Sequence, residues 1–332
     1  MTAIKKRLFI FVCDIGAAQI IRTVFSKLSA KFAISLCVSQ SATNYFQNYP
    51  NIPHKVTKTS DEALVQLKTI QPELVLLGTS NQNQIEPHII KAARQLKIKT
   101  VAFVDQWQNY QVRFKQFNKF VLPDKIILPD NNAIQEFKKE VGDHGDLACG
   151  GQPYLRSLTL RPSARKVKKQ QAKTLFISEP ISSTLNRQQI QQIYGYDEKV
   201  TFFAILKVLR HLRAKQTLSV KLHPKENKLN RTKSAYHCRY NSFSHQQLMQ
   251  YDLVIGMAST VLLEAYILGL NVYVFQPQAS SQFDHCMLSR YGYLRRCTTS
   301  RDLLLSIRQR VRKNRRLDFL KIRDDRFIST IS

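Results

Sequence analysis

The chain has 332 residues, which is too long for one ordinary core and suits two domains of roughly 150 residues each. Lysine and arginine total 51 against 23 acidic residues, a formal charge of +28, so we expect an anionic partner: nucleic acid, an acidic membrane face or a phosphorylated substrate. No apolar stretch reaches the roughly 18 to 20 residues of a membrane span, and the first apolar run ends at Asp14 without a cleavage site, so we expect a buried strand there and no signal peptide.

Near-continuous apolar runs alternate with amphipathic segments through the first half. The predicted strands cover 7–13, 32–38, 73–78, 100–104 and 125–129, and the predicted helices cover 17–28, 60–70, 86–96 and 131–141. This alternation is typical of a parallel sheet with helices on both faces, and it predicts a doubly wound, Rossmann-like α/β domain over 1–155. We expect Ser60 and Asp130 to cap two of the helices.

The segment 156–172 is basic and has no apolar period, so we interpret it as a linker. The pattern then restarts and predicts a second Rossmann-like domain over 173–300. Its expected strands are 174–178, 217–222, 252–257 and 271–276, with helices at 198–212 and 259–269. Apolar residues at helical spacing in 301–332 predict a basic C-terminal helix that packs back toward the N-terminal domain. Six cysteines without a CxxC pair indicate reduced thiols in a cytosolic protein and no structural zinc.

Open parallel sheets bind ligands beyond the carboxyl ends of their strands, and the first such place holds Asp14 and Gly16. Gly16 would let the backbone turn closely, and the small residues after it would open a helix whose free amides accept an anion or a sugar hydroxyl. Asp14 would then stand at the rim of a cleft. Alternatively, Asp14 only caps that helix. The GxGxxG nucleotide motif is absent.

The second place is "VDQWQNYQVRF", where Asp105 follows a strand and precedes Trp107, the only tryptophan of the chain. A carboxylate at a strand end beside aromatic surface would serve as a general base toward a sugar hydroxyl. Equally, Asp105 is a helix cap and Trp107 a core residue.

Two further places lie in the second half. In "KLHPKE", His223 would offer imidazole N–H groups to a phosphate, Pro224 would fix the turn, and Lys221 would add positive charge. In "DLVIGMASTVLLEAYILG", Ser259 and Thr260 begin a helix whose hydroxyls, free amides and dipole form an anion site. The alternatives are an ordinary surface histidine and an ordinary serine cap.

Glu264 lies one turn beyond Thr260 on the same helix face, in the apolar context "VLLEAYIL". An unpaired charge would be unfavourable there, so we expect the carboxylate to accept hydrogen bonds from ribose hydroxyls. The alternative is a solvated glutamate.

The quoted segments resemble bacterial glycosyltransferases of the GT-B architecture, in which two Rossmann-like domains face each other across a cleft. "KLHPKE" is similar to the HP motif, and "DLVIGMASTVLLEAYILG" to the serine/threonine motif, of GT-B sialyltransferases and CDP-glycerol glycerophosphotransferases. "DIGAAQ", "FVDQWQNY" and "LACGGQPYL" resemble a group linked to surface-polysaccharide synthesis.

By this resemblance, His223 meets the donor phosphate, Ser259 and Thr260 hold it, and Glu264 approaches the ribose. The acidic triplet that supplies the base in the sialyltransferases is not evident, which leaves Asp14 or Asp105 as the base. No DxD motif is present, so the expected transfer needs no metal and no cofactor beyond a CMP-, CDP- or UDP-linked donor. The acceptor would be a surface glycan or a lipid-linked molecule, and both domains would close on the substrates.

Basic residues gather at 161–169, 221–233 and 308–316, which predicts weak docking to an anionic membrane surface from the cytoplasmic side. Each cluster is alternatively a solvated helical face. A nucleotide-sugar 2-epimerase is the rival enzyme, although we would expect a glycine-rich segment and paired glutamates where this chain has "MASTVLLEA". Nucleic-acid binding rests on charge alone, because no recognition motif accompanies it, so we expect no specific nucleic-acid partner.

Overall fold

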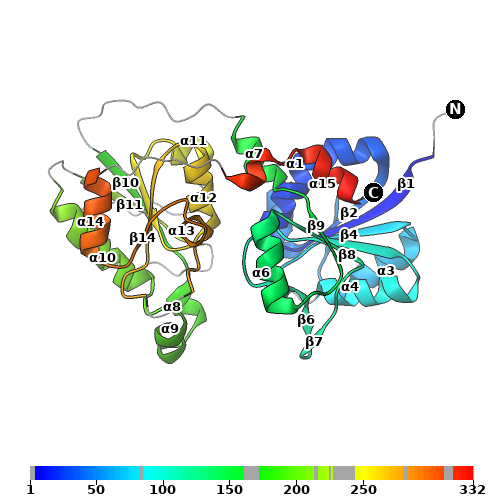
Figure 1. The fold of residues 1–332 in the computed structure, drawn as a ribbon. Coiled ribbons are helices and arrows are strands. Elements are labelled where there is room, and N and C mark those ends of the chain that lie inside the picture. The colour runs from blue at the N-terminus through cyan, green and yellow to red at the C-terminus, as the bar shows by residue number, and fades with distance from the viewer. Residues whose placement is uncertain are drawn as a thin grey trace. The chain divides into compact units, whose positions relative to one another are not determined.

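The computed structural model describes residues 4–81, 85–160, 172–212, 216–223, 226, 244–279, 283–309 and 317–331. The chain forms two compact units (Figure 1). Unit 1 comprises 1–157 together with 317–332, and unit 2 comprises 158–316. The chain therefore passes from unit 1 to unit 2 and then returns.

Unit 1 is built on a seven-stranded sheet, in the order β3-β2-β1-β4-β5-β8-β9, whose neighbouring strands are all parallel. The strands are β1 (Lys6–Val12), β2 (Phe32–Ser39), β3 (Lys55–Thr57), β4 (Leu74–Gly78), β5 (Lys99–Phe103), β8 (Lys125–Leu128) and β9 (Asp146–Cys149). Strand order reverses between β1 and β4, and ligands of doubly wound sheets bind beyond the carboxyl ends of the strands at such a point.

The helices of unit 1 are α1 (Ile15–Lys31), α2 (Gln40–Phe46), α3 (Ser60–Ile70), α4 (Ile85–Gln95), α5 (Tyr110–Phe114), α6 (Asn131–Val141) and α7 (Pro153–Leu158). A short antiparallel hairpin, β6 (Lys115–Gln116) and β7 (Lys119–Phe120), follows α5. Asp130 caps α6 as predicted, through a 2.8 Å bond from the Ala133 amide. The cap of α3 is Thr59 and not the predicted Ser60, which is already helical.

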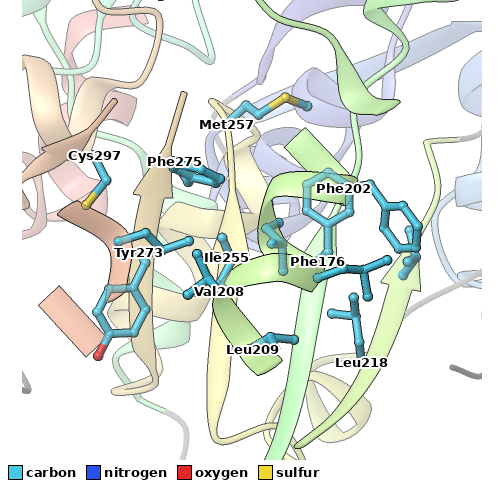
Figure 2. Close-up of a cluster of buried hydrophobic side chains, with 14 of the residues drawn as sticks. Phe176, Phe202, Val208, Leu209, Leu218, Ile255, Met257, Tyr273, Phe275 and Cys297 are labelled. Atoms are coloured by element: carbon cyan, nitrogen blue, oxygen red, sulfur yellow. The ribbon is translucent and has the colours of Figure 1, made fainter. Parts of the chain in front are cut away.

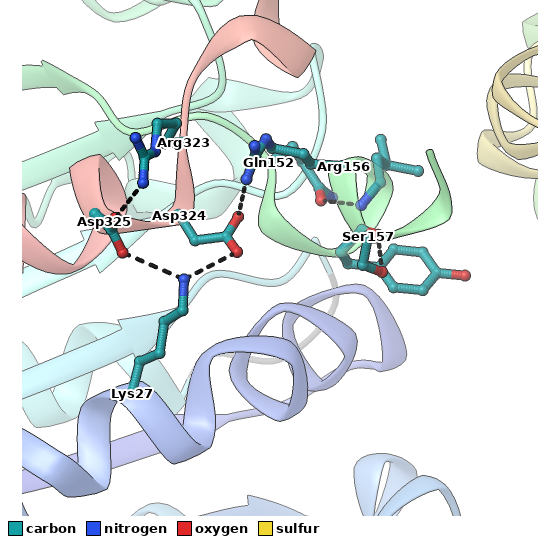
Figure 3. Close-up of polar contacts among 9 residues, drawn as sticks. Lys27, Gln152, Arg156, Ser157, Arg323, Asp324 and Asp325 are labelled. Atoms are coloured by element: carbon teal, nitrogen blue, oxygen red, sulfur yellow. Dashed lines mark hydrogen bonds and ion pairs between the residues drawn. The ribbon is translucent and has the colours of Figure 1, made fainter. Parts of the chain in front are cut away.

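The C-terminal segment returns to unit 1 as the 3₁₀ helix η1 (Asp318–Lys321) and α15 (Asp324–Ile331). Phe327 packs edge-on against Phe103 with ring centroids 5.6 Å apart. Lys27 on α1 bonds both acids at the start of α15, at 3.4 Å from Asp324 and 3.2 Å from Asp325 (Figure 3). Aromatic burial and ion pairs thus fix the end of the described chain to unit 1.

The predicted C-terminal helix over 301–332 is two separate pieces in the structure. Its first part is α14 (Ser300–Gln309), which belongs to unit 2, where Leu303 and Ile307 join the core. Its second part is η1 and α15 in unit 1. The apolar residues of the two parts are buried in different cores, so one continuous helix does not form.

Unit 2 is built on a five-stranded parallel sheet in the order β11-β10-β12-β13-β14. The strands are β10 (Ala172–Ile177), β11 (Gln216–Lys221), β12 (Leu253–Gly256), β13 (Asn271–Phe275) and β14 (Arg296–Cys297). The other helices are α8 (Ile181–Thr184), α9 (Arg187–Ile193), α10 (Glu198–Arg210), α11 (His245–Leu248), α12 (Thr260–Ile267) and α13 (Met287–Arg290). The order reverses between β10 and β12.

The core of unit 2 lies between this sheet and the helices α10 and α14. Figure 2 shows Phe176, Phe202, Ile255 and Phe275 among its buried side chains. A core of this kind holds the sheet rigidly, so that the loops at its carboxyl edge are positioned by well-packed strands.

Candidate functional site

At the carboxyl edge of the unit 1 sheet, the structure brings together Asp14, Gly16 and Asp105. Asp14 caps α1 by accepting a 3.2 Å bond from the Ala17 amide. Gly16 lies directly against Asp105, because a methyl group at position 16 would overlap the Asp105 carboxylate. Both functions proposed for Asp14 from the sequence, cap and strand-end acid, are therefore compatible.

Asp105 is held by a buried cation. Arg113 Nη1 lies 3.0 Å from the Asp105 carboxylate, and the two side chains are 1% and 4% exposed. The same guanidinium nitrogen donates to the Thr79 carbonyl at 2.9 Å, beyond the end of β4. Since a buried ion pair needs additional hydrogen bonds to be stable, Thr79 completes an arrangement that fixes Asp105 in place.

Asp14 is the more accessible of the two acids, being only partly buried, whereas Asp105 is 3% exposed. Burial and the negative charge of Asp105 raise the pKa of Asp14 to about 6, although Arg113 opposes the shift. A carboxylate with a pKa in this range is a suitable general base near neutral pH.

Trp107 lies in the core and not on the surface. Its indole N–H donates to Asp130 at 2.8 Å, and its ring packs against Phe319 with centroids 4.8 Å apart. With a residue exposure of 3%, it does not offer an aromatic surface to an acceptor. The core alternative raised by the sequence is the one the structure shows.

Glu86, in the first turn of α4, was missed by the sequence analysis. Its carboxyl group lies beside the Cys13 thiol and Ser80, and neither oxygen has a hydrogen bond of normal geometry within the described residues. The residue is 2% exposed, and burial raises the pKa of Glu86 to about 7. An acid on the apolar side of a predicted helix, in "EPHII", was the signal that could have found it.

At the carboxyl edge of the unit 2 sheet, the start of α12 carries a bound carboxylate from the protein itself. Glu179, two residues past the end of β10, accepts from the amide of Ala258 at 2.6 Å and from that of Ser259 at 2.9 Å. Ser259 caps α12 by accepting from the Val261 amide at 3.3 Å. Burial raises the pKa of Glu179 to about 7, while the amides oppose the shift. These amides form an anion site.

The sequence analysis overlooked Glu179 although it follows a predicted strand directly. Histidine and hydroxyl groups are the expected phosphate ligands in the second half, and a carboxylate such as Glu179 is not one of them. The rule that strand-end polar residues form sites would have included it.

The histidine turn lies beside this site. The main-chain amide of His223 donates to Glu226, whose other oxygen accepts from the Ser178 hydroxyl. Lys221 is the last residue of β11, and burial lowers the pKa of Lys221 against the opposing charges of Glu264 and Glu226. Pro224 lies outside the described residues, so its predicted role in the turn has no structural counterpart here.

Glu264 has a protein partner. Its carboxylate lies 3.2 Å from His245 Nε2, and the two side chains are 13% and 17% exposed. The pair links α11 to α12. Thr260, the first residue of α12, lies half-buried next to the serine cap.

His223, Ser259 and Thr260 lie at one edge of one sheet. Lys221 and Gly256 both pair with Ile177 of β10, the strand between them, so β11 and β12 end at the same level. Strands two places apart are about 10 Å from each other, a separation that a diphosphate with its ribose can span.

Two other expectations concern metals and membranes. No group of three or more His, Cys, Asp or Glu that could hold a metal ion occurs among the described residues. No described helix is both long enough and apolar enough to span a bilayer. Most of the basic clusters 161–169, 221–233 and 308–316 lies outside the described ranges, as do residues 161–171 of the predicted linker 156–172. The predicted linker begins too early and ends one residue late, because 156–158 belong to α7 and 172 begins β10.

No protein-family model and no curated protein sequence matches the chain. Many solved structures match it over most of its length. They include a putative UDP-N-acetylglucosamine 2-epimerase from Listeria monocytogenes, with a TM-score of 0.62 and 12% identity over 98% of this chain and 91% of that one. They also include the glycotransferase of kitacinnamycin (TM-score 0.59, 10% identity, 98% of this chain and 96% of that one) and the wall teichoic acid polymerase TagF (TM-score 0.52, 10% identity, 98% and 82%).

At identities this low the likeness concerns the fold. The two parallel sheets, each with an order reversal, and the match over both units show the GT-B type of architecture, with two Rossmann-like α/β domains. The predicted fold class is confirmed.

Proposed function

We propose that this chain is a glycosyltransferase that moves a sugar, or a polyol phosphate, from a nucleotide-activated donor to a glycan or lipid-linked acceptor. The observation that carries the proposal is the pair of amides at the start of α12, which hold the Glu179 carboxylate. Amides arranged for a carboxylate oxygen are equally suited to a phosphate oxygen. The solved structures of this architecture include enzymes named for nucleotide-sugar chemistry and for polymer synthesis, which supports this use of the fold.

In this proposal the donor phosphate replaces Glu179 on the amides of Ala258 and Ser259. Because the pKa of Glu179 is raised to about 7, the carboxyl group can take up a proton as it leaves the amides. His223 and Lys221 supply positive charge to the leaving phosphate, and Glu264 accepts from the ribose. The leaving-group charge is then balanced by protein groups, without a metal ion or another cofactor.

We assign the general base to Asp14. Asp105 is bonded to Arg113 at 3.0 Å, and using it as a base would break a buried ion pair. Asp14 is partly exposed and has a pKa near 6, so the transfer rate should rise as the pH increases through that value and the carboxylate ionises. In this assignment Asp105 and Arg113 are positioning residues.

The first test is donor binding, followed by the shift in melting temperature with CMP, CDP, UDP, GDP and their sugars. We expect one nucleotide class to stabilise the protein, and the shift to disappear in His223→Ala and in Ser259→Pro. Proline removes the main-chain N–H at position 259, where φ is already −58°. Asp14→Asn is the matched control, because it should keep the shift and lose transfer. A protein that no nucleotide stabilises would contradict the proposal.

A second candidate function is a nucleotide-sugar 2-epimerase, favoured by the likeness in fold to the Listeria enzyme. The two functions differ in their need for an acceptor. UDP-N-acetylglucosamine incubated with the protein alone should stay unchanged if the chain is a transferase. Appearance of the 2-epimer by proton NMR, without any acceptor, would establish the epimerase instead.

A further inference from the structure

The hairpin β6–β7 has an unusual turn. Its two connecting residues, Phe117 and Asn118, both have positive φ, at 46° and 61°. Turns of this kind favour glycine or asparagine, since a side chain at positive φ crowds the backbone. Asn118 fits this preference, whereas an aromatic residue at position 117 is strained.

Burial of the side chain does not offset this strain, because Phe117 is 88% exposed. The hairpin is held by other residues: Gln116 is buried, accepts from Lys91 at 2.6 Å and bonds the His88 ring at 2.8 Å. A strained and exposed aromatic residue whose neighbours hold the structure suggests a function outside the fold.

The hairpin and the residues next to it in the sequence carry charge of one sign. Between Asp105 and Asp124 the sequence contains no acidic residue, and Lys115 and Lys119 flank the turn. The Lys115 ammonium lies 5.6 Å from the centre of the Phe120 ring, which is itself 37% exposed. Figure 1 shows the hairpin projecting from the body of unit 1. The tip therefore combines apolar rings with positive charge.

We propose that the hairpin 115–120 is a membrane contact, in which Phe117 enters the interface of an anionic bilayer while Lys115 and Lys119 bind lipid headgroups. Aromatic residues favour the headgroup level, and each nearby lysine adds to the attraction. A stable protein partner would need about 800 Å² of surface on each side, which a two-residue tip does not offer. The inference is independent of the proposed reaction, since donor binding by unit 2 is measured without lipid.

The test is sedimentation of the full-length protein with vesicles of phosphatidylcholine, with and without phosphatidylglycerol. We expect binding to the anionic vesicles that weakens with salt. Phe117→Gly should reduce the partition coefficient about tenfold, as expected for loss of a buried aromatic side chain. Lys119→Gln should reduce it about fivefold at low salt.

The matched controls lie on α3, where Val65 is 62% exposed and Lys68 is also exposed. Val65→Ser and Lys68→Gln remove the same kinds of group and should leave binding unchanged. Phe117→Gly should also keep or raise the melting temperature, because glycine relieves the strain at positive φ. A melting temperature lowered by Phe117→Gly would show that Phe117 is structural, and would overturn the proposal.

A second readout follows the tip itself. The only tryptophan of the natural chain, Trp107, is buried, so Phe117→Trp adds a single exposed fluorophore. Its emission should shift to shorter wavelength with anionic vesicles and be quenched by brominated lipid. In the fluorescence measurement, the proposal is overturned if the emission does not shift while the protein sediments with vesicles, or if RNA shifts the emission and vesicles do not. In the sedimentation measurement, it is overturned if the native protein does not bind vesicles, or if Phe117→Gly binds them as well as the native protein does.

Discussion

The two sheet edges balance buried negative charge in different ways. In unit 1 the Asp105 carboxylate is paired with the guanidinium of Arg113, and both are almost fully buried. In unit 2 the Glu179 carboxylate rests on two main-chain amides. The first arrangement is specific for one partner, because guanidinium and carboxylate match in shape and charge.

The second arrangement is open to exchange, because main-chain amides accept any suitably placed anion. The two sheets therefore hold their acids differently. In unit 1 the acid is fixed by a buried cation, whereas in unit 2 another anion can take the place of the acid on the amides. This contrast is the physical basis for assigning the donor phosphate to unit 2 and the positioned acids to unit 1.

The largest expected effect comes from removing the cation of unit 1. Arg113→Leu leaves Asp105 buried and unpaired, which should lower the free energy of unfolding by about 4 kcal/mol. Urea denaturation measures this change. The double variant Arg113→Leu with Asp105→Asn removes the unpaired charge and should recover most of the loss. If the single variant is as stable as the native protein, the pair does not have the role described.

A slightly smaller effect is expected from Glu86, which has no such cation beside it among the residues that the structure describes. Its pKa is about 7 in the folded state against an ordinary value of 4.5, so the folded state binds the proton more tightly. The resulting stabilisation is fully present below pH 4.5 and is lost as the pH rises through 7. Relative to Glu86→Gln, the native protein should lose up to about 3 kcal/mol across this range. Glu62→Gln on the exposed face of α3 is the control, and parallel pH profiles for native and Glu86→Gln proteins would contradict the prediction.

Gly16→Ala tests how tightly the acids of unit 1 are packed. The added methyl group overlaps the Asp105 carboxylate and must displace this partner of Arg113. Overpacking of this kind should cost about 2 kcal/mol. Gly145→Ala is the control for backbone strain. An added methyl group at position 145 meets no atom of the described residues within 4 Å, but φ there is +82°, so this variant measures strain without overlap. Equal losses in both variants would show that overlap with Asp105 is unimportant.

The smallest effects are expected at the open edge of unit 2. Ser259→Ala removes the cap of α12 and should lower the free energy of unfolding by about 1 kcal/mol. At pH 4, where Glu179 is protonated, Glu179→Gln keeps an oxygen that accepts from both amides, so we expect a change within about 0.5 kcal/mol there. Thermal or urea unfolding compares the two. A loss for Glu179→Gln as large as that for Arg113→Leu would remove the contrast between the units.

Much of the fold follows from the sequence because long apolar runs dominate it. The central strands of both sheets and the helices α3, α6 and α10 were predicted close to their observed positions. The strands β3, β9 and β14 were not predicted, because two to four residues at a sheet edge carry too little pattern. The division of the C-terminal segment between two cores depends on tertiary packing, which helical spacing does not reveal.

The candidate site was only partly predictable. The strand-end rule found Asp14, Asp105 and the start of α12, since it depends only on topology. It did not show that Arg113 pairs with Asp105 or that Glu179 occupies the amides, because both contacts join residues whose closeness only the fold creates. For Trp107, one prediction placed the ring at the acceptor surface because it lies close to Asp105 in the sequence. The structure instead buries the ring in the core.

The return of the chain to unit 1 has a consequence for synthesis on the ribosome. Residues 317–331 cover Trp107 and Phe103 with aromatic rings, yet they are translated after all of unit 2. Domains usually fold as they emerge. Unit 2 can therefore be completed before unit 1, although its synthesis begins later. Until 317–331 are made, part of the core of unit 1 stays uncovered. Nascent chains arrested with residues up to 316 outside the ribosome and 317–331 still inside its tunnel should therefore be protected from protease in unit 2 and sensitive in unit 1.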